Sequence, residues 1–197
     1  MQYKALLTAS AALLVAGTTA AADTFTDPAA YDAAVGAQVQ PDYDNLAAVS
    51  FPADTTTDFY GFFDVTPNGG TAAFNTASNF TMTFAAGGLT STVITLPTPS
   101  TGISGIWSNT FVQDGFAVTI NGTTYDLAAI NGDTLGADFV GITDATPFTE
   151  VTLTTAPPGG GDFVFFTDFY YAPAVVPEPA SLGLLGLAGL GLLRRRR

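Results

Sequence analysis

The side chains of this sequence that are able to do chemistry are almost all carboxylates, hydroxyls and phenols. The chain contains no cysteine and no histidine. Ser/His and Cys/His nucleophiles are therefore excluded, as are metal sites built on imidazole or thiolate. An enzyme would need a carboxylate pair of the glycosidase kind, with Glu150 and the aspartates as its candidates. Because no basic neighbour exists to tune such a pair, we predict that the protein is not an enzyme.

Calcium is the metal that these side chains suit best, because it binds oxygen ligands. The first candidates are Asp42, Asp44 and Asp168. Further acidic or amide groups occur at 54–58, at 131–133 and at Asp162, and none of them has the spacing of a calcium loop. Asp, Asn and Gly are also ordinary turn residues. We therefore expect turns and no cofactor, with a structural calcium ion as the alternative.

Aromatic side chains offer a route to carbohydrate binding, by stacking on sugar rings. The candidates for such a platform are Trp107, Tyr60, Tyr125, Tyr170 and Tyr171. Most of the 16 phenylalanines belong to a core, and Trp107 suits a core as well as a platform. Tyr170 and Tyr171 are adjacent, so they point to opposite faces of a strand and at least one should be partly exposed.

The charges of the chain are unevenly distributed. Seventeen acidic and five basic residues give a formal charge of -12, and the basic ones are Lys4 and the four arginines at the C-terminus. Residues 23–176 hold 16 acidic residues and no Lys, Arg or His. Nucleic acid, anionic lipid and phosphate ligands are excluded as partners of this part, whereas a cationic partner is permitted. An acidic surface that keeps an exported protein soluble is the simplest explanation.

Residues 23–174 have the pattern of an all-β domain. Alternating apolar residues at 80–84 and at 116–120 indicate strands with one buried face. Asn121-Gly122 follows the second of these and predicts a tight hairpin, because both residues accept positive φ. Further strands are expected at 39–46, 58–65, 89–96, 102–111, 138–143, 148–155 and 162–171. We predict an antiparallel β-sandwich, jelly-roll-like, and place a β-helix second because no repeat has a fixed period.

One short helix is expected before the strands, at residues 28–35. Thr26 or Asp27 can cap it, Pro28 suits its first turn and Gly36 can end it. The sequence indicates no second helix within the domain.

The N-terminal segment, residues 1–22, has the form of a secretory signal peptide. Lys4 precedes an apolar stretch at 5–15, and Ala20 and Ala22 form an A-x-A cleavage site before Asp23. We therefore expect the protein to be exported.

The C-terminal segment, residues 175–197, has three parts. Pro177, Glu178 and Pro179 form an extended, protease-accessible ribbon. The apolar stretch 182–193 would be ~18 Å long as a helix, short against a hydrocarbon core of ~30 Å. Its leucines, expected to lie in the membrane, are Leu182, Leu184, Leu185, Leu187, Leu190, Leu192 and Leu193. The cytoplasmic anchor that follows is Arg194, Arg195, Arg196 and Arg197, which places the domain outside the membrane.

This ordered tail resembles the bacterial PEP-CTERM sorting signal, also called the "ice-binding protein C-terminal" domain. The resemblance implies recognition by an exosortase-type membrane protease, a transient anchor in the inner membrane, and delivery to the cell surface or extracellular matrix. The alternative is a C-terminal core helix. Residues 139–172 also resemble the closing strands of jelly-roll, carbohydrate-binding-like domains, which implies the fold and no binding residue.

The expected function is that of an exported, non-catalytic cell-surface or matrix protein. The alternative is a carbohydrate- or calcium-binding module, with extracellular polysaccharide as a further partner, and a glycoside hydrolase is third. Loss of the tail would leave a soluble, strongly acidic body.

Overall fold

The computed structural model describes residues 22–74, 80–83, 91–109, 115–132, 136–156 and 163–175. Both predicted terminal segments lie outside these ranges, except for Ala22 at the end of the first and Val175 at the start of the second. The cleavage residue Ala20, the Pro-Glu-Pro motif, the apolar leucines and the arginines therefore remain predictions. Within the described ranges, no helix combines the length and the apolar character that a membrane crossing requires.

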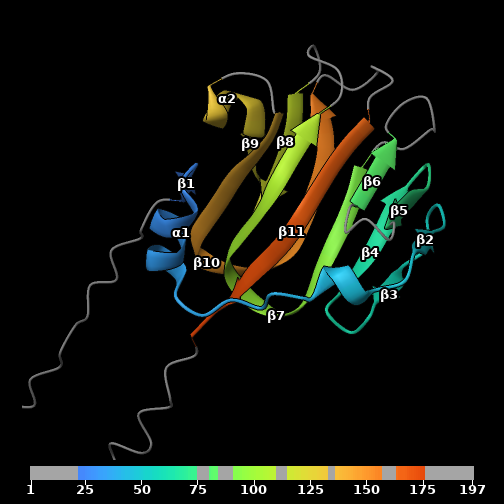
Figure 1. Cartoon of the computed structure of the whole chain (residues 1–197), viewed down its shortest axis with the longest axis horizontal. Helices are drawn as coiled ribbons and strands as arrows, with labels where there is room; N and C mark the ends of the chain where they lie inside the picture. Colours follow the sequence, from blue (N-terminus) through green and yellow to red (C-terminus); the bar gives the residue numbers. More distant parts are fainter. Residues whose placement is uncertain are drawn as a thin grey trace, which may run out of the picture.

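The described strands form a β-sandwich in which all neighbours run antiparallel, as the sequence predicts (Figure 1). The strands are β1 Asp23–Phe25, β2 Val49–Phe51, β3 Thr57–Phe59, β4 Phe63–Asn68, β5 Ala72–Phe74, β6 Phe80–Thr83, β7 Ser91–Asn109, β8 Gly115–Ile120, β9 Thr123–Asp126, β10 Gly136–Ala156 and β11 Phe163–Pro173. The first sheet has the order β3-β4-β7-β10-β8-β9, and the second has the order β2-β5-β6-β11-β7-β10-β1. The jelly-roll label is finer than this and stays a prediction.

Two long strands belong to both sheets, which makes the ladder continuous through 11 strands. The start of β7 pairs with the end of β10 in the first sheet, and the rest of β7 pairs with the start of β10 in the second. Pro97 and Pro99 lie where β7 passes between the sheets, and Pro147 lies in the matching stretch of β10, where the register shifts. Proline cannot donate a ladder hydrogen bond, so pairing is interrupted there. The prediction of separate strands at 89–96 and 102–111, and at 138–143 and 148–155, is therefore wrong.

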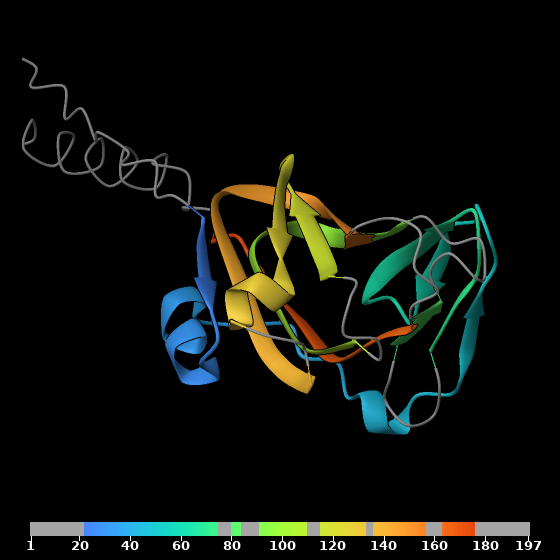
Figure 2. The same cartoon turned by 90° about the horizontal axis from the view of Figure 1, so that it is seen from above.

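The core lies between the two sheets, which appear as two layers from above (Figure 2). Alternate residues are buried in β4, in residues 91–96 of β7 and in residues 150–154 of β10, as the two-residue period of a strand requires. Trp107, the single tryptophan, is 1% exposed and its ring contacts Phe116 and Phe166, each at a centroid distance of 5.3 Å. Its indole nitrogen donates to the Val140 carbonyl at 3.0 Å, so the polar atom of this core residue is satisfied.

The predicted N-terminal helix is confirmed as α1, Pro28–Val35. The Asp27 carboxylate accepts from the Ala29 amide at 2.8 Å at its start, and Gly36 follows it with φ 73°. Tyr31, fully buried, fixes the helix to the second sheet by lying over two glycines: a Cβ added to Gly141 would be 2.4 Å from the Tyr31 ring, and one added to Gly102 would be 2.8 Å from its hydroxyl. Only glycine allows the ring to approach this closely.

Other elements differ from the prediction. A second helix, α2 at Leu127–Asn131, follows β9, because the Asp126 carboxylate caps it by accepting from two α2 amides at 3.0 and 3.2 Å. The expected strand at 39–46 is a single bridge from Val39 to Tyr171, followed by the 3-10 helix η1, Tyr43–Asn45. The expected strand at 58–65 is divided into β3 and β4 by a turn at Tyr60 and Gly61, both with positive φ.

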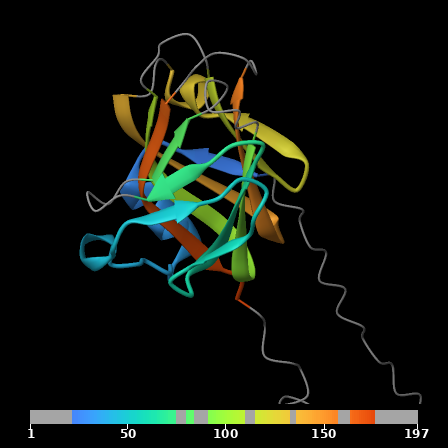
Figure 3. The same cartoon turned by 90° about the vertical axis from the view of Figure 1, so that its right-hand side faces the viewer.

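The chain also contains three short strands that the pattern did not indicate, β1, β2 and β5. β1 lies beside α1, and β2 and β5 lie at the opposite end of the sandwich (Figures 1 and 3). The Asn121-Gly122 hairpin between β8 and β9 is confirmed, with φ 49° and 78° at the two residues.

Candidate functional site

The aromatic residues considered for sugar stacking do not form a common platform. Trp107 and Tyr171 are 1% and 4% exposed and belong to the core, where the Tyr171 hydroxyl donates to the Phe62 carbonyl at 3.1 Å. Tyr170 is half-buried and stacks on Tyr43 at a centroid distance of 6.4 Å. Burial raises the pKa of Tyr171, as expected for a phenol held in a core. Three of the five candidates therefore serve packing rather than sugar binding.

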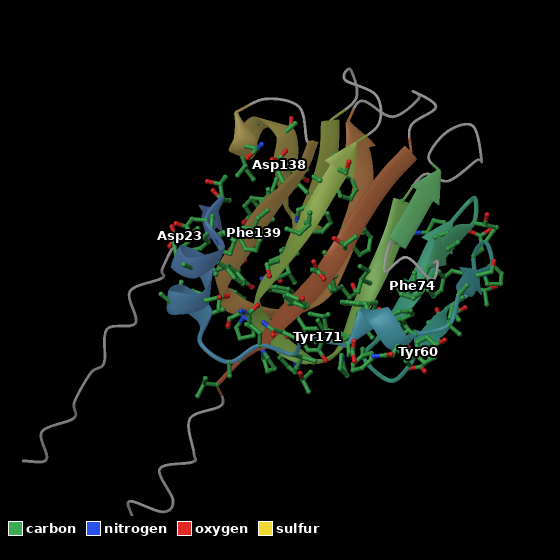
Figure 4. The ribbon with its side chains drawn as sticks, viewed as in Figure 1. Asp23, Tyr60, Phe74, Asp138, Phe139 and Tyr171 are labelled. Carbon is green, nitrogen blue, oxygen red and sulfur yellow. The ribbon has the colours of Figure 1, made fainter. Side chains whose placement is uncertain are left out.

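The other two tyrosines belong to different elements. Tyr60 is 44% exposed at the turn between β3 and β4, with φ 54°, and its hydroxyl donates to the Ala47 carbonyl at 3.0 Å (Figure 4). Tyr125 is half-buried in β9, and burial, with a smaller contribution from the Asp144 carboxylate, raises its pKa. A stacking site built on this set of five aromatics is not assembled.

The calcium candidates come from two segments that the structure brings near each other. The Tyr43 hydroxyl in η1 donates to the Phe169 carbonyl, next to Asp168 in β11. Asp42 accepts from the Asn45 amide at 2.7 Å, and Asp168 is exposed at an irregularity of β11 with φ 52°. The side chain of Asp44 lies outside the description. Among the described residues no three acidic side chains converge on a common point, and calcium binding stays a prediction.

Most described aspartates make turns and helix caps. Their carboxylates accept from backbone amides at 2.6–3.2 Å; these residues are Asp27, Asp54, Asp58, Asp126, Asp138 and Asp144. Two aspartates are labelled in Figure 4: Asp138 in β10, and Asp23 in β1, where it pairs with Thr143 of β10. Such bonds satisfy donors that turns and helix ends leave open, so these acids need no ligand to explain them.

The outer face of the first sheet is rich in polar side chains, and we call it the hydroxyl face. Strand pairing places 13 residues on this face, and all of them except the buried Ala117 are at least partly exposed; they are Asp64, Thr66, Asn68, Ser91, Val93, Thr95, Glu150, Thr152, Thr154, Ala117, Thr119, Thr124 and Asp126. Eleven of these 13 are polar, and none is aromatic. The face therefore presents hydroxyls and carboxylates in register across five strands.

Neighbouring polar side chains on this face bond to one another across strands. The Thr119 and Thr124 hydroxyls are 2.8 Å apart, and the Asn68 amide donates to the Ser91 hydroxyl at 2.8 Å. These bonds hold the side chains in fixed rotamers, which lowers the entropy cost of ordering them against a ligand.

A hollow of about 360 Å³ opens on the hydroxyl face, and we call it the Glu150 hollow. Its floor includes Thr119, Glu150 and Thr152, and its rim is formed by the β8–β9 turn and by the stretches of β7 and β10 that pass between the sheets. Asn121 fixes this rim, because its amide donates to the Asp144 carboxylate at 3.1 Å and to the Thr146 carbonyl at 2.9 Å. The hollow is thus built from three separate segments and is mainly polar.

Among the described residues that line this hollow, Glu150 is the one with a carboxylate. It is exposed and, within the described part of the chain, accepts no hydrogen bond, unlike the turn-forming aspartates. Thr95 pairs with Glu150 on one side and with Asp64 on the other. Paired residues share a face, so the two carboxylates lie in one row, with Cα atoms about 10 Å apart by the spacing of adjacent strands.

Sequence reasoning considered Glu150 only as a catalytic acid and missed the hydroxyl face. A signal was present, because Thr152 and Thr154 alternate with buried residues in β10. Their alignment with Thr119 and Asp64 depends on strand pairing, which the sequence pattern does not provide.

Comparison with known proteins finds two solved structures of the family 29 carbohydrate-binding module CBM29-2. A lysine-to-alanine mutant has a TM-score of 0.42 and 10% identity, and covers 68% of this chain and 99% of its own. An aspartate-to-alanine mutant complexed with mannohexaose has a TM-score of 0.40 and 12% identity, and covers 64% of this chain and 92% of its own. Among curated proteins, none matches the chain.

The C-terminal segment matches a protein family. Residues 175–197 match the family model described as the PEP-CTERM protein-sorting motif, which confirms the resemblance seen in the sequence. This motif implies an exported protein that a membrane-associated exosortase recognises. The chain therefore ends in a PEP-CTERM protein-sorting motif that follows directly on a β-sandwich.

Proposed function

We propose that the protein is a non-catalytic component of the bacterial cell surface or extracellular matrix, released from the membrane when its tail is removed. The observation that supports this most strongly is the position of the sorting motif. β11 ends at Pro173, and the motif begins at Val175, which is 88% exposed. The tail can thus be cut without removing any part of the described sandwich.

The two ends of the domain lie close together. Asp23 begins β1, Val175 follows β11, and both line one hollow of about 450 Å³. The Ala174 amide donates to the Pro99 carbonyl at 2.8 Å, so the chain is held to the sandwich up to the start of the motif. This arrangement suits a domain that is held at one end by its tail and freed by one cut.

The non-catalytic part of the proposal is supported by the chemistry of the Glu150 hollow. Glycosidases need two carboxyl groups flanking the bond that is cleaved, at most ~9.5 Å apart. Among the described residues that line the hollow, Glu150 alone carries a carboxyl group, and Asp64 lies in the row beside the hollow rather than in its lining. A polar floor without a second carboxyl group suits binding better than hydrolysis.

Cell fractionation tests the sorting proposal. A chain in which Pro177, Glu178 and Pro179 are all replaced by alanine should accumulate in the membrane fraction, whereas the unchanged chain reaches the surface or the medium. Asp168→Asn is the matched control, since it alters an exposed residue of β11, outside the motif, and should be sorted normally. Release of the triple-alanine chain at the normal rate would contradict the proposal.

A second candidate function is glycan binding, and the hydroxyl face favours it. Sugar hydroxyls pair with hydroxyl, amide and carboxylate groups, and the face presents all three in one plane. The aromatic platform expected from the sequence does not contribute to this candidate.

A further inference from the structure

The Glu150 hollow and the row beside it have a chemistry that selects among ligands. Residues 23–176 hold 16 acidic residues and no basic one, so an anionic ligand is repelled and finds no partner. The polar floor of the hollow offers an apolar ligand little to contact. A second copy of the chain has the same acidic charge and is also repelled.

A bare metal ion also fits the hollow poorly. At about 360 Å³ it is near the lower end of the range of small-molecule sites, which is ~300–1,000 Å³. Calcium needs six to eight oxygen ligands and usually several carboxylates, and one carboxylate lines this site. The size and the hydroxyl lining suit a sugar unit.

Two carboxylates and the negative charge of the domain determine which kind of sugar the face would bind. Glu150 and Asp64 accept no hydrogen bond within the described part of the chain, and they lie about 10 Å apart in one row with Thr95 between them. A linear polymer that lies across the strands meets both carboxylates and the Thr95 hydroxyl in turn. Ammonium groups on such a polymer pair with the carboxylates, while its hydroxyls bond to the threonines.

We propose that the hydroxyl face, at the Glu150 hollow and the Asp64–Thr95–Glu150 row, binds an amine-bearing polysaccharide. This inference rests on the proposed function, because an exported surface protein is the one that meets such a polymer. It assigns the recognition to hydrogen bonds and ion pairs, without aromatic stacking. Binding should therefore weaken as salt rises.

Isothermal titration with two matched probes tests the proposal. Glucosamine oligomers, which carry amines, and N-acetylglucosamine oligomers, which do not, are titrated into the full chain in mild detergent, at a mildly acidic pH that keeps the sugar amines protonated. Glucosamine oligomers should bind and N-acetylated ones should bind several-fold more weakly. Glu150→Gln and Asp64→Asn should each weaken binding about two- to fivefold, the range measured for exposed ion pairs.

Asp168→Asn is the control that separates a site from general attraction. It removes one exposed acid on β11, outside the hydroxyl face, and asparagine tolerates the positive φ of that position. It should leave the affinity for glucosamine oligomers within the error of the measurement. An equal loss in Asp168→Asn and Glu150→Gln would overturn the site.

The other outcomes of the titration also test the proposals. Equal binding of both oligomers, or binding of neither, would overturn the proposed ligand and leave the sorting of the protein unaffected. Shortening of the oligomers during the titration would instead contradict the proposed non-catalytic function. The fractionation experiment has its own readout, so the two proposals fail separately.

Discussion

The substitution Gly141→Ala tests how α1 is held to the second sheet. A Cβ at this position would lie 2.4 Å from Cδ2 and 2.8 Å from Cγ of Tyr31, far inside van der Waals contact. Gly141 lies within paired β10 backbone, so alanine itself fits the backbone and the cost is steric. Overpacking of a tight core typically costs about 1–3 kcal/mol. At the scale expected for a domain of this size, the melting temperature falls by about 2–4 °C for each kcal/mol.

The assay is urea unfolding followed by the fluorescence of Trp107, the single tryptophan, which is buried and reports on the core. Gly136→Ala in the same strand is the matched control, because, among the described residues, its added Cβ would meet the Asp138 carboxylate alone, at 3.8 Å. Tyr31→Ala alone should cost about 3–5 kcal/mol, as for other large aromatic truncations. In that background Gly141→Ala should cost almost nothing, since the ring that it clashes with is gone. An undiminished cost there would refute the reasoning.

Three further perturbations test single contacts. Burial, and to a smaller extent nearby negative charge, raises the pKa of Tyr43 above its ordinary ~10. The neutral Tyr43 phenol therefore contributes its full stability below pH ~10, and this contribution is lost as the pH rises above that value. Tyr43→Phe should therefore cost about 1 kcal/mol at pH 7, through the lost bond to the Phe169 carbonyl, and should flatten the loss of stability that urea titrations show above pH ~10. Asp126→Ala should cost about 1 kcal/mol by uncapping α2, and Asp126→Asn should restore most of it; equal losses in both would contradict the cap. Asn121→Ala should destabilise by about 1–3 kcal/mol, and Asn121→Gly by less, because glycine keeps the positive φ and loses only the bonds that reach Asp144 and its neighbour.

Features of the fold that rest on local chemistry were predictable from the sequence. α1 has its cap, its proline and its terminal glycine within ten residues, and the hairpin at Asn121-Gly122 needs only two. The same local rules did not indicate α2, although Asp126, the last residue of β9, caps it. An aspartate can equally close a turn, and the helix that follows it also depends on Leu127, which is buried in the core.

Features that depend on pairing between distant segments were not predictable. Whether 89–96 and 102–111 are one strand or two depends on β10, which supplies partners to both halves of β7. The sequence allowed Trp107 to lie either in the core or on a sugar-binding platform. Its contacts with the rings of Phe116 and Phe166 show that it lies in the core. The hydroxyl face likewise exists only once β4, β7, β8 and β10 are in register, because no single strand carries more than a few of its residues.

The proposed role as a sorted surface protein is tested most directly by the intact mass of the protein that cells release. The released chain should begin near Asp23 and should lack the segment after about Pro177, including all four arginines. Deleting the exosortase-type protease should abolish that species and leave the longer chain in the membrane. Released surface protein that still carries Arg194, Arg195, Arg196 and Arg197 would contradict the account.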